Sequence, residues 1–406
     1  MRERVIFYVS ALGIATGLVS GVPATGRRVW AIFVGLALLG VDYDEAIRRN
    51  SKDPCPFYNR GIAWSSKDEN DRAIADFNEA LRLNPNYAAA LFHRGIAWTD
   101  KGDYDRAIAH YSAAIRLNPK RADNFFARGA AYAMKRDYDR AIADFDSAIR
   151  LNPRDAVFYN NRGDAYAAKG NRDHDYSEAI RLDPKNVLAY NARGQAWRAK
   201  GELDRAILDL TKAIAISPLP TTDVNGRRVN FYVNRGIAWN AKGEFDRAIS
   251  DFDQAVRLDP NDPEAYGNRG LAWIAKDDYN RGIADLSETI RLDPRSSSAY
   301  YLRGVAQYDN YTRAPASFDK SDLGRAIADL TDAIRLDPDH ADAYYYRGLA
   351  WSANGDRGHA IADLTEAVQL RPYSERMISA LKQVEPETPD GTVITTDSLK
   401  RFLEKH

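Results

Sequence analysis

The sequence predicts an all-α protein, an α-solenoid of about nine stacked helix-turn-helix repeats. The main observation is a tripeptide, any residue followed by Arg-Gly, whose glycine recurs mostly at intervals of 34 residues along the 406-residue chain. A proline recurs later in each repeat and accounts for nine of the 17 prolines. We call the glycine of the tripeptide the repeat glycine and the arginine before it the repeat arginine. The repeat glycines are Gly61, Gly95, Gly129, Gly163, Gly194, Gly236, Gly270, Gly304 and Gly348.

The second repeat shows why each repeat is expected to contain two helices. Apolar residues follow one another at helical spacing over 91–98 and again over 104–115. A Lys-Gly-Asp sequence at 101–103 lies between these stretches and predicts the turn. An Asn-Pro sequence at 118–119 closes the second stretch, because proline cannot continue a helix.

Deviations from the regular spacing indicate where the array is interrupted. Relative to the 34-residue period, three residues are missing in the fourth repeat, eight are added after the fifth, and ten are added within the eighth. The chain therefore divides into a degenerate leading half-repeat (42–53), five repeats (54–220), a linker (221–228), four repeats (229–374), a capping helix (375–384) and a flexible tail with a short helix (385–406). We expect the ten added residues, near 310–320, to enlarge the turn between two helices.

The repeats resemble tetratricopeptide repeats. The first copy, FYNRGIAW followed by RAIADF and NP, runs from Phe57 to Pro85, and eight more copies follow in register over 54–374. Every copy departs from the family pattern in the same way, because arginine precedes the glycine where the family usually has leucine. The resemblance implies a right-handed superhelix, with the first helix of each repeat lining a concave groove that binds a protein or peptide partner.

That resemblance also implies which side chains line the groove. They lie one or two places before the repeat arginine, and they are aromatic residues and asparagines that offer apolar contact and hydrogen bonds to an extended main chain. The alternative is that several of them pack against the adjacent repeat. The predicted groove residues are Tyr58, Phe92, Phe126, Asn160, Asn161, Asn191, Asn234, Asn268, Tyr301 and Tyr345.

The nine repeat arginines admit two interpretations. They form a basic track for acidic or phosphorylated ligands, or each pairs with an aspartate of a second helix. The second interpretation agrees with the equal numbers of basic and acidic residues, 57 of each. The aspartates available for such pairs are Asp76, Asp144, Asp251, Asp285, Asp329 and Asp363.

The N-terminal residues 1–41 are largely apolar and indicate export. Residues 5–26 carry no charge and are long enough to cross a bilayer core, which takes roughly 20 residues. The basic start and the small residue Ala24, placed for cleavage, are typical of a signal peptide, whereas an uncleaved segment is a membrane anchor. Both interpretations predict a periplasmic or membrane-anchored protein with membrane contact through 5–26, and a cytoplasmic protein is the alternative.

The remaining composition favours a protein without enzymatic activity. A net charge of zero argues against nucleic-acid binding, which depends on basic surfaces. The six histidines are scattered over different repeats and Cys55 has no histidine near it in sequence, so we expect no catalytic residue, no metal site and no cofactor. The sequence predicts a scaffold that binds a peptide or protein partner; the alternative is a structural component of a membrane complex that associates with itself.

Overall fold

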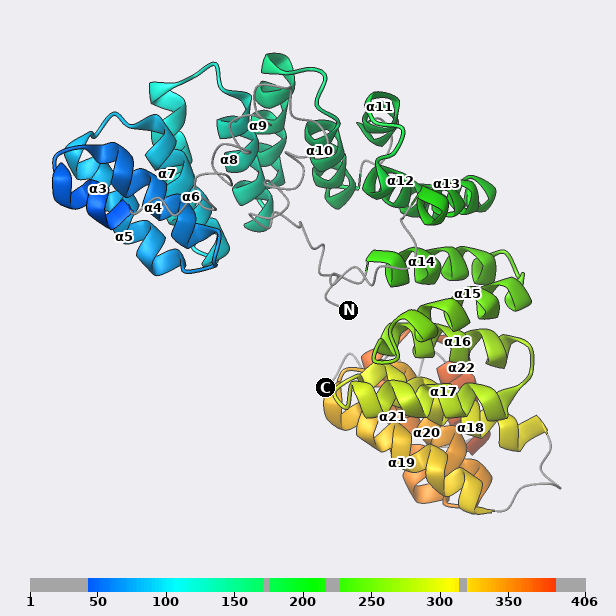
Figure 1. Cartoon of the computed structure of the whole chain (residues 1–406). Coiled ribbons are helices and arrows are strands. Elements are labelled where there is room, and N and C mark those ends of the chain that lie inside the picture. The colour runs from blue at the N-terminus through cyan, green and yellow to red at the C-terminus, as the bar shows by residue number, and fades with distance from the viewer. Residues whose placement is uncertain (1–42, 171–174, 217–226, 314–319, 385–406) are drawn as a thin grey trace. The chain divides into compact units, whose positions relative to one another are not determined.

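The computed structural model describes residues 43–170, 175–216, 227–313 and 320–384. These residues form twenty α-helices and no strand, so the predicted all-α class is confirmed. The helices alternate along the chain as first and second helices of successive repeats. Within residues 43–199 and within residues 203–384, each helix packs on its neighbours in sequence, as α8, α9 and α10 do side by side in Figure 1.

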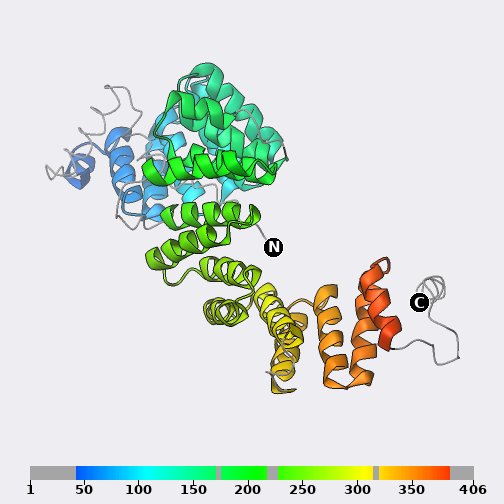
Figure 2. The same cartoon turned by 90° about the vertical axis from the view of Figure 1, so that its right-hand side faces the viewer.

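The helices fall into two compact units that divide between Lys200 and Gly201, inside the fifth repeat. In the second unit, the orange-to-red helices of Figure 2 show the same side-by-side packing. The first unit contains α3 (Tyr43–Arg49), α4 (Pro54–Ser65), α5 (Asn70–Leu83), α6 (Ala88–Asp100), α7 (Tyr104–Leu117), α8 (Ala122–Met134), α9 (Tyr138–Leu151), α10 (Ala156–Ala168), α11 (Asp175–Leu182) and α12 (Val187–Ala199). The second contains α13 (Leu203–Ile216), α14 (Arg227–Ala241), α15 (Phe245–Leu258), α16 (Pro263–Ala275), α17 (Tyr279–Leu292), α18 (Ser297–Arg313), α19 (Lys320–Leu336), α20 (Ala341–Asn354), α21 (Arg357–Leu370) and α22 (Glu375–Val384).

Several predictions from the sequence lie outside the described residues. These are the apolar segment 1–41, most of the linker 221–228, and the tail 385–406. None of the described helices combines the length and the apolar character needed to cross a bilayer. The terminal helix α22 covers the same residues as the predicted capping helix.

Aspartate caps fix the starts of several second helices. The carboxylate of Asp103 accepts a hydrogen bond from the backbone N–H of Arg106 at the start of α7, and Asp137 caps α9 in the same way. Gly102, which precedes Asp103, has a φ of 77°, a left-handed conformation that glycine adopts without strain. The predicted Lys-Gly-Asp turn is therefore confirmed.

The repeat glycine lets the two helices of a repeat approach closely. A Cβ atom on Gly95 would lie 2.6 Å from the ring of Tyr111 on α7, and one on Gly236 would lie 2.6 Å from the ring of Phe252 on α15. Both rings are almost completely buried and cannot move aside in a close-packed interior. Glycine is therefore required at this position by packing.

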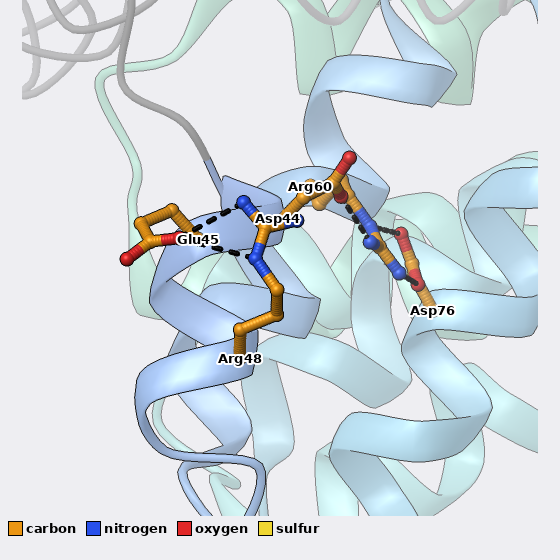
Figure 3. A network of polar contacts seen from close by, with 5 residues as sticks. All are labelled: Asp44, Glu45, Arg48, Arg60 and Asp76. Carbon is orange, nitrogen blue, oxygen red and sulfur yellow. Dashed lines mark hydrogen bonds and ion pairs between the residues drawn. The ribbon is translucent and has the colours of Figure 1, made fainter.

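The repeat arginines pair with aspartates of the second helices, as one interpretation of the sequence predicts. In the first repeat, Nε and Nη2 of Arg60 donate to the two carboxylate oxygens of Asp76 at 2.8 and 2.7 Å (Figure 3). Nη1 of Arg60 reaches Asp44 of α3, which belongs to the preceding half-repeat. On α3, Glu45 pairs separately with Arg48, as the same view shows.

The same two-sided contact recurs along both compact units. Seven of the nine repeat arginines each make a bidentate pair with an aspartate of their own repeat and a single hydrogen bond to the preceding second helix. The bidentate pairs after the first are Arg128–Asp144, Arg162–Asp175, Arg235–Asp251, Arg269–Asp285, Arg303–Asp329 and Arg347–Asp363. These arginines are therefore committed to ion pairs within the chain, and a basic track for acidic ligands does not form from them.

The second repeat departs from this rule because His110 stands where the other repeats carry the aspartate. Nη2 of Arg94 lies 3.1 Å from Nδ1 of His110, and its Nη1 donates to Asn78 at 2.6 Å. The Nε atom of Arg94 is buried and has no hydrogen-bond partner. Arg94 thus lacks the carboxylate that its counterparts bind.

The irregular repeats differ in helix length. The second helix of the fourth repeat, α11, has eight residues, whereas α9 and α13 have fourteen. In the eighth repeat α18 and α19 each have 17 residues, so part of the added sequence lengthens the helices instead of the turn. Residues 314–319 of that insertion lie outside the described residues.

Replacing His110 with aspartate should stabilise the protein. The new carboxylate would accept hydrogen bonds from Nε and Nη2 of Arg94, and we expect His110→Asp to raise the free energy of unfolding by about 1–2 kcal/mol, as a charge-assisted hydrogen bond does. Urea unfolding at pH 7 measures the change. The control is His110→Asn, which has a similar size but no charge and should gain less. Equal or lower stability of His110→Asp would contradict this account.

The same histidine should make folding sensitive to acid. Burial, followed by the charges of Arg94 and Arg106, lowers the pKa of His110 to about 4, below the 6.5 of an unperturbed histidine. The unfolded chain binds the proton more tightly, so the contribution of His110 is complete above pH 6.5 and is lost as the pH falls toward 4. On going from pH 7 to pH 5, His110→Asn should lose less unfolding free energy than the wild type. Parallel pH dependences of the two proteins would show that His110 does not titrate in this way.

Candidate functional site: the first-helix surface

The first helices of successive repeats gather on one side of each compact unit. Where helices two places apart in the chain are in close contact, they are both first helices, as α4 and α6 are, or α18 and α20. Contacts of this kind bend a row of repeats toward the first helices and make that side the inner one. We call the side of the first helices that faces away from the second helices the first-helix surface.

The ten predicted groove residues all lie on first helices, but their exposure differs. Three of them are buried, namely Phe92 (4% exposed), Phe126 (9%) and Asn160 (9%). The others are partly exposed: Tyr58, Asn161, Asn191, Asn234, Asn268, Tyr301 and Tyr345.

Phe92 and Phe126 pack between repeats. The ring of Phe92 lies 5.8 Å from that of Tyr111, and the guanidinium of Arg121 covers it at 4.9 Å. Phe126 lies 5.8 Å from Phe145 and 5.0 Å from Phe158 of the next repeat. Packing therefore accounts for both phenylalanines, as the alternative interpretation of the sequence expected, and they present little surface to a partner.

Two of the asparagines bind their own helices. Nδ2 of Asn161 donates to the carbonyl oxygen of Val157 at 2.9 Å, and Nδ2 of Asn268 donates to that of Glu264 at 2.8 Å. These contacts fix the orientation of both amides. The structure does not bring the asparagines into one cluster with the tyrosines, because they lie in different repeats.

Tyrosines gather on the first-helix surface of the eighth and ninth repeats. Tyr345 and Tyr346 of α20 lie 5.2 Å apart between ring centroids, and Tyr346 lies 6.0 Å from Tyr301 and 6.1 Å from Tyr308 of α18. We call these four residues the tyrosine patch. Burial raises the pKa of Tyr301 to about 12, so its hydroxyl stays protonated at neutral pH and can donate as well as accept a hydrogen bond.

Charged side chains border the tyrosine patch. Asp342 at the start of α20 pairs with Arg371, at 2.8 Å, and with Arg376 of α22. The guanidinium of Arg376 also lies over the ring of Tyr345, 4.8 Å from its centroid. The ion pair between Arg376 and Asp342 therefore joins the capping helix to α20 beside the patch. The guanidiniums of Arg371 and Arg376 both pair with Asp342, and that of Arg376 also contacts the patch.

A second, smaller aromatic cluster lies in the first and second repeats. The ring of Tyr58 lies 4.9 Å from that of Tyr87 and 5.5 Å from that of His93, and its hydroxyl lies 3.2 Å from Nδ1 of His93. Burial lowers the pKa of His93 to about 4, so the ring is neutral at physiological pH. This cluster is therefore aromatic and uncharged.

His93, Tyr308 and Tyr346 were not among the groove residues predicted from the sequence. A usable signal was present for two of them, because His93 and Tyr346 directly precede a repeat arginine, as Asn161 and Asn268 do. Tyr308 lies four places after the repeat glycine of the eighth repeat, where helical spacing places it near Tyr301 on the same face of α18.

The metal-ligating side chains and the single cysteine are further groups that could carry chemistry. Within them, no three histidine, cysteine, aspartate or glutamate side chains are close enough to hold a metal ion. The thiol of Cys55 is exposed, and partial burial together with Asp53 raises its pKa, which disfavours the reactive thiolate.

Comparisons with known proteins agree with the repeat pattern. A family model described as tetratricopeptide repeat matches residues 58–122, 174–219 and 311–375, and a model described as TPR repeat matches 136–170 and 236–276. No curated protein sequence matches the chain.

Solved structures show similarity of fold. A structure of the APC/C hetero-tetramer Cut9–Hcn1 aligns with 87% of this chain and 82% of its own, with 16% identity and a TM-score of 0.50. YrrB, described as a TPR protein with an unusual peptide-binding site, aligns with 52% of this chain and 98% of its own (18% identity, TM-score 0.40). MamA aligns with 38% of this chain and 93% of its own (28% identity, TM-score 0.37). The in-register repeats, the paired helices and the family matches together show that this chain belongs to the tetratricopeptide repeat proteins.

Proposed function

We propose that this protein is a non-enzymatic scaffold that holds an extended segment of another protein on its first-helix surface. Membership of the tetratricopeptide repeat family supports a role in protein interaction. Stacked repeats supply a rigid row of helices, and recognition then depends on the side chains that the row presents.

The tyrosine patch is the observation that carries this proposal. Four tyrosines on two neighbouring first helices are only partly buried, and the ring centroid of Tyr346 lies 5.2, 6.0 and 6.1 Å from those of Tyr345, Tyr301 and Tyr308. Tyrosine gives a large apolar contact area at a low cost in side-chain entropy, and its hydroxyl hydrogen-bonds to a main chain. Residues of this kind are enriched among those that dominate binding energy at protein interfaces.

Removing two rings of the patch should weaken partner binding. In an affinity purification with the full-length protein as bait, we expect Tyr301→Ala/Tyr345→Ala to recover about tenfold less of the partner, or less still, than the wild type does, because a tyrosine at the centre of an interface is worth about 2 kcal/mol or more. Mass spectrometry of the captured proteins gives the measurement.

Tyr373→Ala provides the matched control, because Tyr373 is 82% exposed and lies outside the patch. This variant should recover the partner as the wild type does, and circular dichroism should show that both variants keep their helices. Unchanged recovery by the double variant would remove the patch from the binding surface. Recovery of this chain alone would favour the self-associating structural role.

We also propose, from the sequence of residues 5–26, that the protein is exported and is periplasmic or attached to the membrane. Fractionation of cells that carry a C-terminally tagged full-length protein, followed by N-terminal sequencing, tests this. A cleaved signal peptide would give a soluble exported protein that begins after Ala24, whereas a retained anchor would leave the protein in the membrane fraction. Recovery from the cytoplasm with residues 5–26 intact would contradict export.

A further inference from the structure

The fourth repeat carries an acidic residue at a position that is apolar in most other repeats. The residue directly after the repeat glycine is aliphatic in seven of the nine repeats, glutamine in the fifth and aspartate in the fourth. That aspartate is Asp164 of α10, one helical turn after Asn160, so both lie on the same face of the helix. The aliphatic counterparts are Ile62, Ile96, Ala130, Ile237, Leu271, Val305 and Leu349.

Asp164 makes two hydrogen bonds and both come from neutral groups. The hydroxyl of Tyr176 on α11 donates to its Oδ1 at 2.7 Å, and Nδ2 of Asn160 lies 3.3 Å from its Oδ2. No lysine, arginine or histidine of the described residues forms an ion pair with it. Asp164 as a whole residue is partly exposed.

This arrangement contrasts with the other acids that lie between the helices. Asp76, Asp144, Asp251, Asp285 and Asp363 are each held by a repeat arginine. A carboxylate removed from water is costly unless a cation and hydrogen bonds compensate it. Burial without a cation raises the pKa of Asp164 to about 7. Asp164 therefore lacks the arginine that neutralises each of those aspartates.

Asn160 provides a second, independent observation at the same place. Asn160 is only 9% exposed, and its amide oxygen is buried without a hydrogen-bond partner. A buried amide oxygen that accepts no hydrogen bond costs about 1–3 kcal/mol. The side chains of Asp164 and Asn160 thus lie side by side; the carboxyl group has no cationic partner, and the amide oxygen has no hydrogen-bond donor.

We propose that Asp164 and Asn160 form a subsite for a cationic N–H donor of the bound polypeptide, namely a lysine or arginine side chain or a free N-terminal amine. Such a group carries several N–H donors and no acceptor. It can form a charge-assisted hydrogen bond to Asp164 and a second hydrogen bond to Asn160. This assignment rests on the proposed function, because it assumes that a polypeptide lies along the first-helix surface.

A peptide selection tests the subsite. Full-length wild type and Asp164→Asn are each used to select peptides from a random dodecapeptide array, synthesised once with free and once with acetylated N-termini. We expect wild-type binders to be enriched in lysine, in arginine or in a free amine, and about tenfold tighter on the wild type than on Asp164→Asn. Enrichment of lysine, enrichment of arginine, or binding that requires a free N-terminus identifies which cation the subsite takes.

Three variants make the comparison specific. In Asp164→Asn the hydroxyl of Tyr176 can still donate to the side chain, so folding should be unaffected. Asp164→Leu restores the aliphatic residue of the other repeats, so it should fold and should also lose the preference for cationic peptides. Asp139→Asn is the matched control, because Asp139 is an exposed acid of α9 paired with Lys169, and its removal should leave the preference unchanged.

The outcomes separate this inference from the proposed function. If the wild type and Asp164→Asn bind the same peptides with equal affinity, the subsite is overturned while the scaffold role stands. If the wild type binds no peptide, the scaffold proposal fails, and the subsite is then decided by titrating the Asp164 carboxyl with carbon-13 NMR in the presence of N-acetyl-lysine methylamide. A fall in its pKa supports the subsite, and an unchanged pKa overturns it.

Discussion

In seven of the nine repeats the repeat arginine pairs with an aspartate of the second helix and so holds the two helices of the repeat together. The aspartates are almost completely buried, Asp251 being 4% exposed, so their desolvation must be compensated by the bidentate contact. The third nitrogen of each guanidinium reaches back to the preceding second helix, as Arg269 does to Asp253. A single side chain therefore fixes both the hairpin angle and the stacking, and it does so with its charge neutralised inside the array.

Because this pairing repeats so regularly, the repeats that break it are informative. His110 takes the place of the aspartate in the second repeat and leaves one nitrogen of Arg94 without a partner. The fourth repeat keeps its pair, Arg162 with Asp175, although its second helix is only eight residues long. That same repeat adds Asp164 on the first helix. The arginine–aspartate pair is thus kept in a repeat whose first helix carries an additional acid. The residues that hold the array together are therefore different from those available to bind a partner.

The sequence predicted the elements that depend on local patterns and failed where burial depends on a neighbouring repeat. The helix pairs, the Lys-Gly-Asp turn and the arginine–aspartate pairs follow from fixed spacings, such as the 16 residues between Arg60 and Asp76. Phe92 and Tyr58 occupy equivalent positions, yet Phe92 is covered by Arg121 whereas Tyr58 keeps part of its surface exposed. The exposure of this side chain depends on the size and reach of side chains one repeat away. The sequence pattern within a single repeat gives no information about those side chains.

The repeat architecture explains how an acid such as Asp164 is tolerated at an otherwise aliphatic position. In a stacked array each repeat contacts only its neighbours, so the cost of burying an uncompensated carboxyl is confined to the fourth repeat and those beside it. The arginine pairs of the remaining repeats are unaffected by that cost. A polypeptide ligand that supplied the missing cation would offset this cost locally, since only in the complex would the carboxylate gain a cationic partner and the amide oxygen of Asn160 a hydrogen-bond donor. Binding would then stabilise the shortened fourth repeat.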